Sequence, residues 1–156
     1  MDMTDLEQRI QRLEDIEAIR SLQSRYQRCV DFHEWDALRE IFTPDAESCY
    51  DSGKMTYKGA DSIVAFLSKS LTKRIKSSHL IHGGEIEIKD STHATGIWYL
   101  EDFLLHRTFL VKLHGTAVYS VGYTKTEQGW RISRIGYRRG YHYLGLRGLI
   151  NCLTLR

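Results

Sequence analysis

The order of the periodic segments along the chain constrains the fold more than any other feature of the sequence. Apolar residues recur at three- and four-residue steps over residues 6–26, behind a Thr4-x-x-Glu7 pattern that is typical of a capping box. Residues 79–144 show strand signals almost continuously. Helices first and strands afterwards predict an α+β domain with a mostly antiparallel sheet, because a parallel sheet needs alternating strands and helices.

Shorter elements are expected between these two blocks. The segment 33–45 has apolar residues on one side and predicts a short helix that is ended by Pro44. The segment 46–59 predicts a β-hairpin with an Asp-Ser-Gly turn, and the segment 60–71 predicts a third helix. We interpret the basic segment 72–78 as a connector to the later strands.

Length and composition indicate one globular domain. A chain of 156 residues is about one domain long, so we expect residues 1–156 to form a single unit. The content of 42% hydrophobic and 27% charged residues is typical of globular proteins and unlike that of disordered chains. The net charge is only +2, whereas nucleic-acid-binding proteins carry a clustered basic surplus, so no nucleic-acid partner is expected.

Cysteine usage and the first residues favour a cytoplasmic protein. Cys29, Cys49 and Cys152 are odd in number and widely spaced, which suits neither a disulfide framework nor a Cys-x-x-Cys site. The opening sequence MDMTDLEQRI is acidic and amphipathic, unlike a secretory signal, and no apolar run approaches the length of a membrane span. We therefore expect a reduced, cytoplasmic setting without membrane association.

Asp31 and His79 are candidate functional residues, although each alone is typical of a structural role. Asp31 closely follows the first helix, where an acidic residue commonly forms a turn or caps the next helix. His79 begins a predicted strand, and His82 lies three residues later on the opposite face, so the two rings are poor partners for one metal. No other motif supplies the three or four ligands of a zinc site, and metal binding is not expected.

Strand alternation selects further candidates. Trp98, Leu100 and Asp102 share one face, so the Asp102 carboxylate is either solvated at the strand end or held in a pocket. Arg138 and Arg139 lie on opposite faces, so at most one points inward, where it needs a carboxylate or an anionic ligand. Most aromatic residues are expected to be core, but tyrosines are frequent in pockets that orient an apolar ligand, and those on the converging elements are Tyr26, Tyr50, Tyr99, Tyr119, Tyr123 and Tyr137.

Together these segments resemble the SnoaL-like branch of the nuclear transport factor two-like superfamily. The resemblance rests on a long helix ending in Tyr26 with Asp31 five residues later, the segment WDALREIFTPDA, the loop before His79, the strand GIWYLEDF, and Gly-Trp before GYRRGY. It spans about residues 6–143 and depends on the order and spacing of these segments. Within the branch, the chain looks most like the bile acid 7α-dehydratase type, with scytalone dehydratase and hexachlorocyclohexane dehydrochlorinase as more distant relatives.

The resemblance implies a cone-shaped domain, in which a strongly curved, mostly antiparallel sheet packs against three to four N-terminal helices as a cystatin-like α+β barrel. It implies that Asp31 and His79 form a catalytic dyad and that Tyr26 is a third catalytic residue. Arg138 is the expected pocket arginine, with Arg139 as its rival. The residues expected to bind substrate are Asp102, Arg138, Trp98, Tyr50 and Tyr119.

The function that we expect from the resemblance is an elimination without cofactor, of the dehydratase type. It would begin with proton abstraction next to a carbonyl or enone in a hydrophobic alicyclic, polycyclic or steroid-like molecule. Two alternatives stay open: a double-bond isomerase similar to ketosteroid isomerase, and a noncatalytic binding or docking domain similar to a dioxygenase β-subunit. The resemblance also implies a homo-oligomer, with a trimer favoured and a dimer as the alternative, in which the apolar tail YLGLRGLINCLTL is expected to cover a neighbour's pocket.

Overall fold

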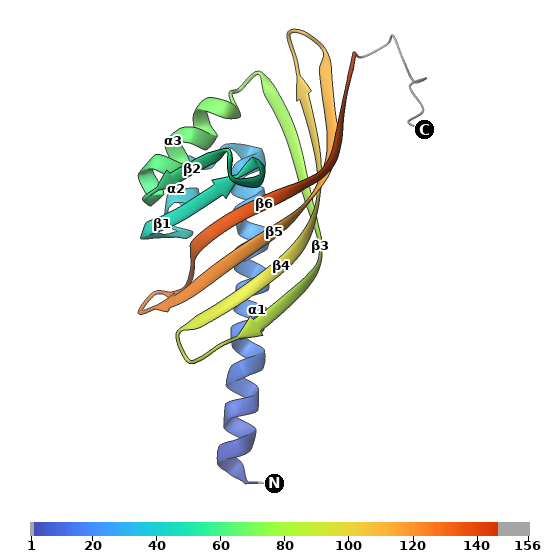
Figure 1. Ribbon diagram of the computed structural model, residues 1–156. Coiled ribbons are helices and arrows are strands. Elements are labelled where there is room, and N and C mark those ends of the chain that lie inside the picture. Colours follow the sequence, from blue (N-terminus) through green and yellow to red (C-terminus); the bar gives the residue numbers. More distant parts are fainter. Residues whose placement is uncertain (1, 147–156) are drawn as a thin grey trace.

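A computed structural model describes residues 2–146 of the chain (Figure 1). Its helices precede the four long strands, in the order that the sequence predicts. The elements are α1 (Met3–Phe32), α2 (Trp35–Arg39), β1 (Phe42–Tyr50), the 3-10 helix η1 (Asp51–Gly53), β2 (Met55–Lys58), α3 (Ala60–Ser70), β3 (Ile75–Ile88), β4 (His93–His106), β5 (Val111–Thr126) and β6 (Gly129–Leu146).

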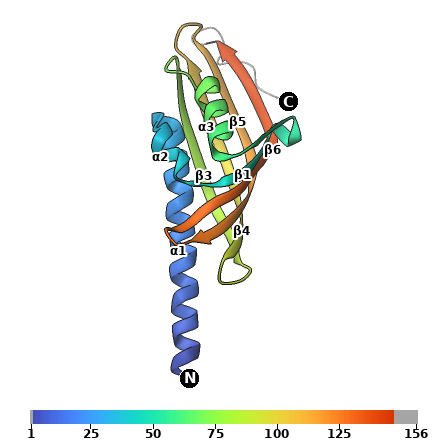
Figure 2. The ribbon, with the colours of Figure 1, turned by 90° about the vertical axis from the view of Figure 1, so that its left-hand side faces the viewer.

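The strands form one six-stranded sheet in the order β2-β1-β6-β5-β4-β3. Among the described strands, β1 and β6 pair in parallel and every other neighbouring pair is antiparallel. The long strands curve around α1, and α3 lies over the same concave side of the sheet (Figures 1 and 2). The expected α+β architecture, a strongly curved and mostly antiparallel sheet packed against helices, is therefore confirmed.

The helix α1 begins and ends differently from the sequence expectation. Asp2 is its N-cap and accepts a hydrogen bond from the Thr4 backbone N–H at 3.4 Å, so the cap precedes the predicted capping box. The helix ends at Phe32, and the C-cap residue His33 adopts the left-handed conformation at φ 60°. Asp31 consequently belongs to the last turn of α1 and not to the turn that follows it.

Only the C-terminal part of α1 lies against the sheet. Ile19 is fully buried, whereas Ile10 and Leu13 on the predicted apolar stripe are 47% and 66% exposed, because the first turns extend beyond the sheet (Figure 1). Asp15 marks the boundary between the two parts. Its carboxylate accepts hydrogen bonds from the side chains of Lys125 at 2.6 Å and Trp130 at 2.8 Å, which tie α1 to β5 and β6.

Two predicted boundaries are wrong. Pro44 lies within β1 and not at the end of the second helix, which already ends at Arg39. The pairing of β1 with β6 shifts register in this region, and such an irregularity accommodates a residue without a backbone N–H. The predicted basic connector also contributes to the sheet, because β3 begins at Ile75 and includes Ser77 and Ser78.

Within the described residues, no helix is long and apolar enough to cross a bilayer. The tail that the sequence analysis expects to cover a neighbour's pocket lies outside the described residues from position 147 onward, as does Cys152.

Truncation of Ile19 tests the packing of α1 on the sheet. Ile19→Ala is expected to lower the free energy of unfolding by about 2–5 kcal/mol, because it leaves a cavity in the core. Ile10→Ala makes the same change on the exposed part of the same helix and should alter it by less than about 0.5 kcal/mol. Urea unfolding followed by circular dichroism measures both values, and equal losses would contradict the packing described here.

Candidate active site

A cavity of about 300 Å³ lies between the concave face of the sheet and the helices α1 and α3. Most of its wall is apolar, and it is the kind of concave site in which a few polar groups orient a ligand. The polar residues of the wall are Tyr26, Tyr50, Ser70, His79, Asp102, Tyr119, Tyr137 and Arg139. A larger groove of about 610 Å³ lies on the outer side of the sheet and contains neither Asp31 nor His79.

The Asp31 carboxylate joins the last turn of α1 to β3. Its Oδ1 lies 2.6 Å from Nδ1 of His79, and its Oδ2 accepts the His79 backbone N–H at 2.9 Å. The Ser77 hydroxyl donates a third hydrogen bond to Oδ1 at 2.8 Å. The two side chains are only 14% and 12% exposed, so the predicted Asp31–His79 pair is formed and largely withdrawn from solvent.

These contacts determine which ring nitrogen of His79 faces the cavity. When Nδ1–H donates to Asp31, Nε2 is the unprotonated nitrogen of the neutral ring. His79 lines the cavity, and Nε2 has no hydrogen-bond partner among the described residues. The arrangement therefore presents a hydrogen-bond acceptor, and a potential proton acceptor, to a ligand in the cavity.

Asp31 is held in its charged form. Burial alone would raise the pKa of this carboxyl, but the hydrogen bond and charge of His79, the backbone N–H and the Ser77 hydroxyl outweigh burial and lower the pKa below its usual value of 3.8. A carboxylate at this position keeps the His79 ring oriented across the neutral pH range.

The lowered pKa of Asp31 predicts a pH dependence of stability. A carboxyl with a depressed pKa in the folded state stabilises the fold above its unfolded pKa, and this contribution is lost as the pH falls through the folded value. Asp31→Asn is therefore expected to lose less unfolding free energy than the wild type between about pH 6 and pH 3. Urea titrations across this pH range measure the loss, with Asp45→Asn at an exposed position as control. Equal losses of unfolding free energy in the wild type and in Asp31→Asn would contradict the prediction.

Asp102 and Arg139 form a second charged pair in the cavity wall. Nη1 of Arg139 donates to both carboxylate oxygens of Asp102, at 2.8 and 2.7 Å. Asp102 is the register partner of His79 on the neighbouring strand, so this pair adjoins the dyad. Gly115 leaves room for it, because a Cβ there would lie 2.9 Å from Oδ1 of Asp102.

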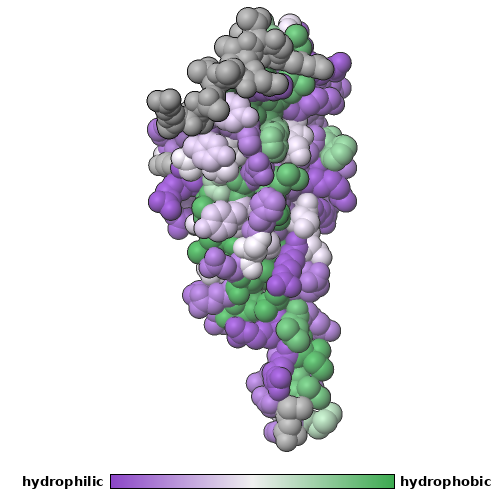
Figure 3. Space-filling model, turned by 90° about the vertical axis from the view of Figure 1, so that its right-hand side faces the viewer, coloured by the Kyte–Doolittle hydropathy of each residue, from purple (hydrophilic) through white to green (hydrophobic). Residues whose placement is uncertain are grey.

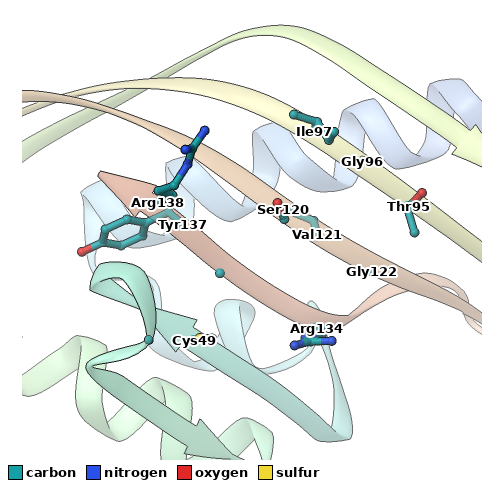
Figure 4. Close-up of a pocket in the computed structure, with 12 residues that line it drawn as sticks. Cys49, Thr95, Gly96, Ile97, Ser120, Val121, Gly122, Arg134, Tyr137 and Arg138 are labelled. Carbon is teal, nitrogen blue, oxygen red and sulfur yellow. The ribbon is translucent and has the colours of Figure 1, made fainter. Parts of the chain in front are cut away.

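The pocket arginine is Arg139, and the expectation of Arg138 is wrong. Residues of β6 alternate between the two faces of the sheet, so Tyr137 and Arg139 contact the cavity, while Arg138 is exposed on the outer side, where it lines the separate groove (Figure 4). The Arg139 guanidinium also lies over the Tyr137 ring, 4.9 Å from its centroid. Burial would lower the pKa of Arg139, but Asp102 and Tyr137 outweigh burial and raise it.

Removal of one partner tests the Asp102–Arg139 pair. Asp102→Ala is expected to lower the unfolding free energy by about 3 kcal/mol, because it leaves an uncompensated cation that is mostly withdrawn from solvent. The double variant Asp102→Ala with Arg139→Met should be less destabilised than the sum of the two single variants. Denaturant unfolding of all four proteins measures this coupling, and strictly additive losses would show that the two groups do not interact.

Three tyrosines place hydroxyl groups at the inner part of the cavity. Tyr26 and Tyr50 lie with their hydroxyl oxygens 3.4 Å apart, and the Tyr119 ring packs edge-on against Tyr26. Burial raises the pKa of all three phenols, well above the usual value of 10 for Tyr26 and Tyr119. They therefore stay protonated at neutral pH and can donate hydrogen bonds to a ligand oxygen.

Trp98, which the sequence analysis assigns to substrate binding, does not contact the cavity. Its indole N–H donates to the Tyr123 hydroxyl at 2.9 Å, and this hydroxyl donates to Gln23 at 2.8 Å, in the closed part of the core. Conversely, Ser77 and Tyr137 belong to the site but were not selected. Each lies two residues before a site residue on its strand, so strand alternation is the signal that identifies them.

No group of three or more His, Cys, Asp or Glu side chains within residues 2–146 is placed to hold a metal ion.

A helix-covered, strongly curved sheet with an interior cavity defines the class of cystatin-like α+β proteins. A model of the SnoaL-like domain matches residues 11–136, and the chain therefore belongs to the SnoaL-like family. The expectation from the sequence resemblance is thereby confirmed at the level of the family.

Solved structures share this fold. An NTF2-like protein with a cystatin-like fold from Novosphingobium aromaticivorans is 25% identical, with a TM-score of 0.75 over 88% of this chain and 90% of that chain. A hexachlorocyclohexane dehydrochlorinase from Novosphingobium barchaimii is 24% identical, with a TM-score of 0.77 over 90% and 95% of the two chains. A scytalone dehydratase candidate from Novosphingobium aromaticivorans is 17% identical, with a TM-score of 0.78 over 96% and 100%.

Proposed function

We propose that this protein is a lyase that needs no cofactor, in which His79 removes a carbon-bound proton from a small hydrophobic substrate. The observation that carries the proposal is the pairing of His79 with the Asp31 carboxylate at 2.6 Å, on the wall of a largely apolar cavity. An imidazole held in one tautomer by a carboxylate is a common general base at neutral pH. The similar folds of a dehydrochlorinase and a scytalone dehydratase candidate add support.

The proposed reaction is the elimination of water from a β-hydroxy carbonyl compound. Nε2 of His79 takes the proton next to the carbonyl, the C–H electron pair becomes the new double bond, and the bond to the hydroxyl breaks. The proton on His79 then passes to the departing hydroxide, which leaves as water, so the base is regenerated. Tyr26 donates a hydrogen bond to the oxygen on which negative charge develops.

Asp102 and Arg139 are proposed to orient the substrate rather than to react. Arg139 contacts Asp102 through Nη1 alone, which leaves the N–H donors of its other guanidinium nitrogens, beside Tyr137, for a further partner. They can therefore bind a carbonyl, hydroxyl or carboxylate oxygen of the substrate while Asp102 balances the charge. Tyr50 and Tyr119 complete the polar groups that we assign to substrate binding.

The cavity also limits the class of substrate. Its apolar wall suits the ring carbons of an alicyclic or polycyclic molecule, and the apolar residues are Val30, Met55, Phe66, Leu67, Leu71, Leu100, Leu104 and Leu113. The volume of about 300 Å³ is at the low end of the range for ligand pockets, which favours the smaller members of this class.

Substitution of His79 tests the proposed base. On a panel of cyclic β-hydroxy ketones, the wild type is expected to form enones, which are followed by ultraviolet absorbance and by loss of one water in mass spectrometry. His79→Ala should lower kcat/KM by about 10²- to 10⁴-fold while the far-ultraviolet circular dichroism stays unchanged. His93→Ala is the matched control, because His93 also pairs with an aspartate but lies exposed on the β3–β4 hairpin.

The same panel separates the alternatives. A product of unchanged mass with a shifted double bond would show that the protein is an isomerase and not a lyase. Ligand binding without turnover in the wild type, equally strong in His79→Ala, would show a binding domain in place of an enzyme. Equal turnover by wild type and His79→Ala would exclude His79 as the base.

A further inference from the structure

The β4–β5 hairpin carries apolar side chains at its tip, where turns usually carry polar ones. Residues 107–110 join the two strands, and Phe109 and Leu110 are 69% and 42% exposed. Hairpin loops favour Gly, Asn and Asp, which tolerate unusual backbone angles. Leu110 nevertheless adopts φ 53°, in the left-handed region that is unfavourable for a large side chain. An exposed apolar tip with a strained backbone is a candidate contact surface.

Local contacts hold this tip in an outward position. The Phe109 backbone N–H donates to Nδ1 of His106 at 3.3 Å, and the two rings stack with their centroids 4.7 Å apart. In Figure 1, the hairpin extends beyond the other described elements at the end of the molecule opposite the N-terminus. Phe109 and Leu110 are therefore presented to the surroundings and do not fold back onto the core.

Five exposed basic residues surround the tip and form what we call the basic collar. Lys73 and Arg74 lie on the loop between α3 and β3, Arg107 lies on the hairpin, and Lys76 and Lys112 lie on the strands that lead to them. The Arg107 backbone N–H donates to the Arg74 carbonyl at 2.8 Å, so the loop and the hairpin lie side by side. The collar and the apolar tip thus belong to one continuous surface.

No acidic residue opposes the collar within its own segments. Asp and Glu are absent from residues 62–84 and 103–126, although the whole chain has 20 of them. No ion pair joins a collar residue to another residue of the described chain. The collar is therefore a local positive surplus in a protein whose net charge is only +2.

We propose that this end of the molecule docks on the surface of an anionic phospholipid bilayer. Phe109 and Leu110 insert among the headgroups, and the basic collar contacts the lipid phosphates. Inserted apolar side chains and nearby cations are the two contributions that together bind proteins to such a surface. An acidic peptide would pair with the cations but would leave the protruding apolar tip in water, so the bilayer fits both features better.

This proposal replaces the expectation of no membrane association. That expectation rested on the lack of a secretory signal and of a spanning segment, and a protein that docks on a surface needs neither. The wall of the interior cavity includes Leu71 just after α3, and Leu104 and Leu113 close to the hairpin. Docking would bring the cavity near the lipid phase in which apolar substrates concentrate. This consequence rests on the proposed function, whereas the docking itself does not.

Cosedimentation with vesicles tests the docking. The wild type is expected to bind vesicles of equal parts phosphatidylcholine and phosphatidylserine, more weakly at high salt, and to bind pure phosphatidylcholine far less. Phe109→Ser should weaken binding about tenfold. Lys73→Glu with Arg107→Glu should weaken it about a hundredfold or more, since each unit of charge near an anionic surface contributes about fivefold. Leu110→Asn should also weaken it without lowering the melting temperature, because Asn tolerates the left-handed backbone.

The first turns of α1 supply matched controls at the opposite end, where apolar side chains are also exposed (Figure 3). Acidic and basic residues alternate there, so no basic surplus accompanies the apolar ones. Leu13→Ser removes a side chain about as exposed as Phe109, and Arg12→Glu with Arg20→Glu makes the same change of net charge. Both controls should bind vesicles as the wild type does, and circular dichroism verifies that every variant is folded.

Four outcomes would overturn the proposal. These are a wild type that does not bind the anionic vesicles, controls that lose as much binding as the hairpin and collar variants, charge variants that bind less while Phe109→Ser binds normally, and wild-type binding to polyglutamate as tight as to the vesicles. A change in the sedimentation of Phe109→Ser without vesicles would show that the tip contacts another protein copy, and would also overturn it. The assay contains no substrate, so its result is independent of the proposed lyase activity.

Discussion

The contact between Asp31 and β3 is the interaction on which the geometry of the site depends. One carboxylate accepts hydrogen bonds from the backbone and ring of His79 and from the Ser77 hydroxyl. It thus fixes the end of a 30-residue helix against an edge strand of the sheet and selects the tautomer of the histidine at the same time. The same carboxylate therefore supports the packing of α1 on β3 and orients the side chain that we propose as the base.

The Asp102–Arg139 pair places a second charged contact beside that of Asp31 with His79. Because His79 and Asp102 are register partners, the two charged pairs lie side by side on a wall that is otherwise apolar. Each carboxylate is neutralised by its own cationic or proton-donating partner, which lowers the cost of placing two acidic groups near one cavity. The cavity can therefore accommodate both the ring carbons and the oxygen atoms of the substrate that we propose.

The sequence predicted the parts of this arrangement that depend on local periodicity. The helix at residues 60–71 and the inward row of Trp98, Leu100 and Asp102 follow from the spacing of side chains, and the hairpin before that helix follows from its Asp-Ser-Gly turn. The spacing of residues does not predict contacts between segments that are distant in the sequence. The pairing of Asp31 with His79 rested on a family resemblance, and the exclusion of Trp98 from the cavity depends on its hydrogen bond to Tyr123, 25 residues away.

Arg138 and Arg139 are neighbours on β6, but they point to opposite faces of the sheet and therefore belong to two different surfaces. On β6, Ile135, Tyr137 and Arg139 alternate with Arg134, Gly136 and Arg138, and the apolar members of the first set already indicate the inward face. The inward arginine neutralises Asp102 beside the cavity, whereas its neighbour points to the outer face and has no partner in its own described chain. A single strand thereby lines the interior cavity with one face and the outer groove with the other.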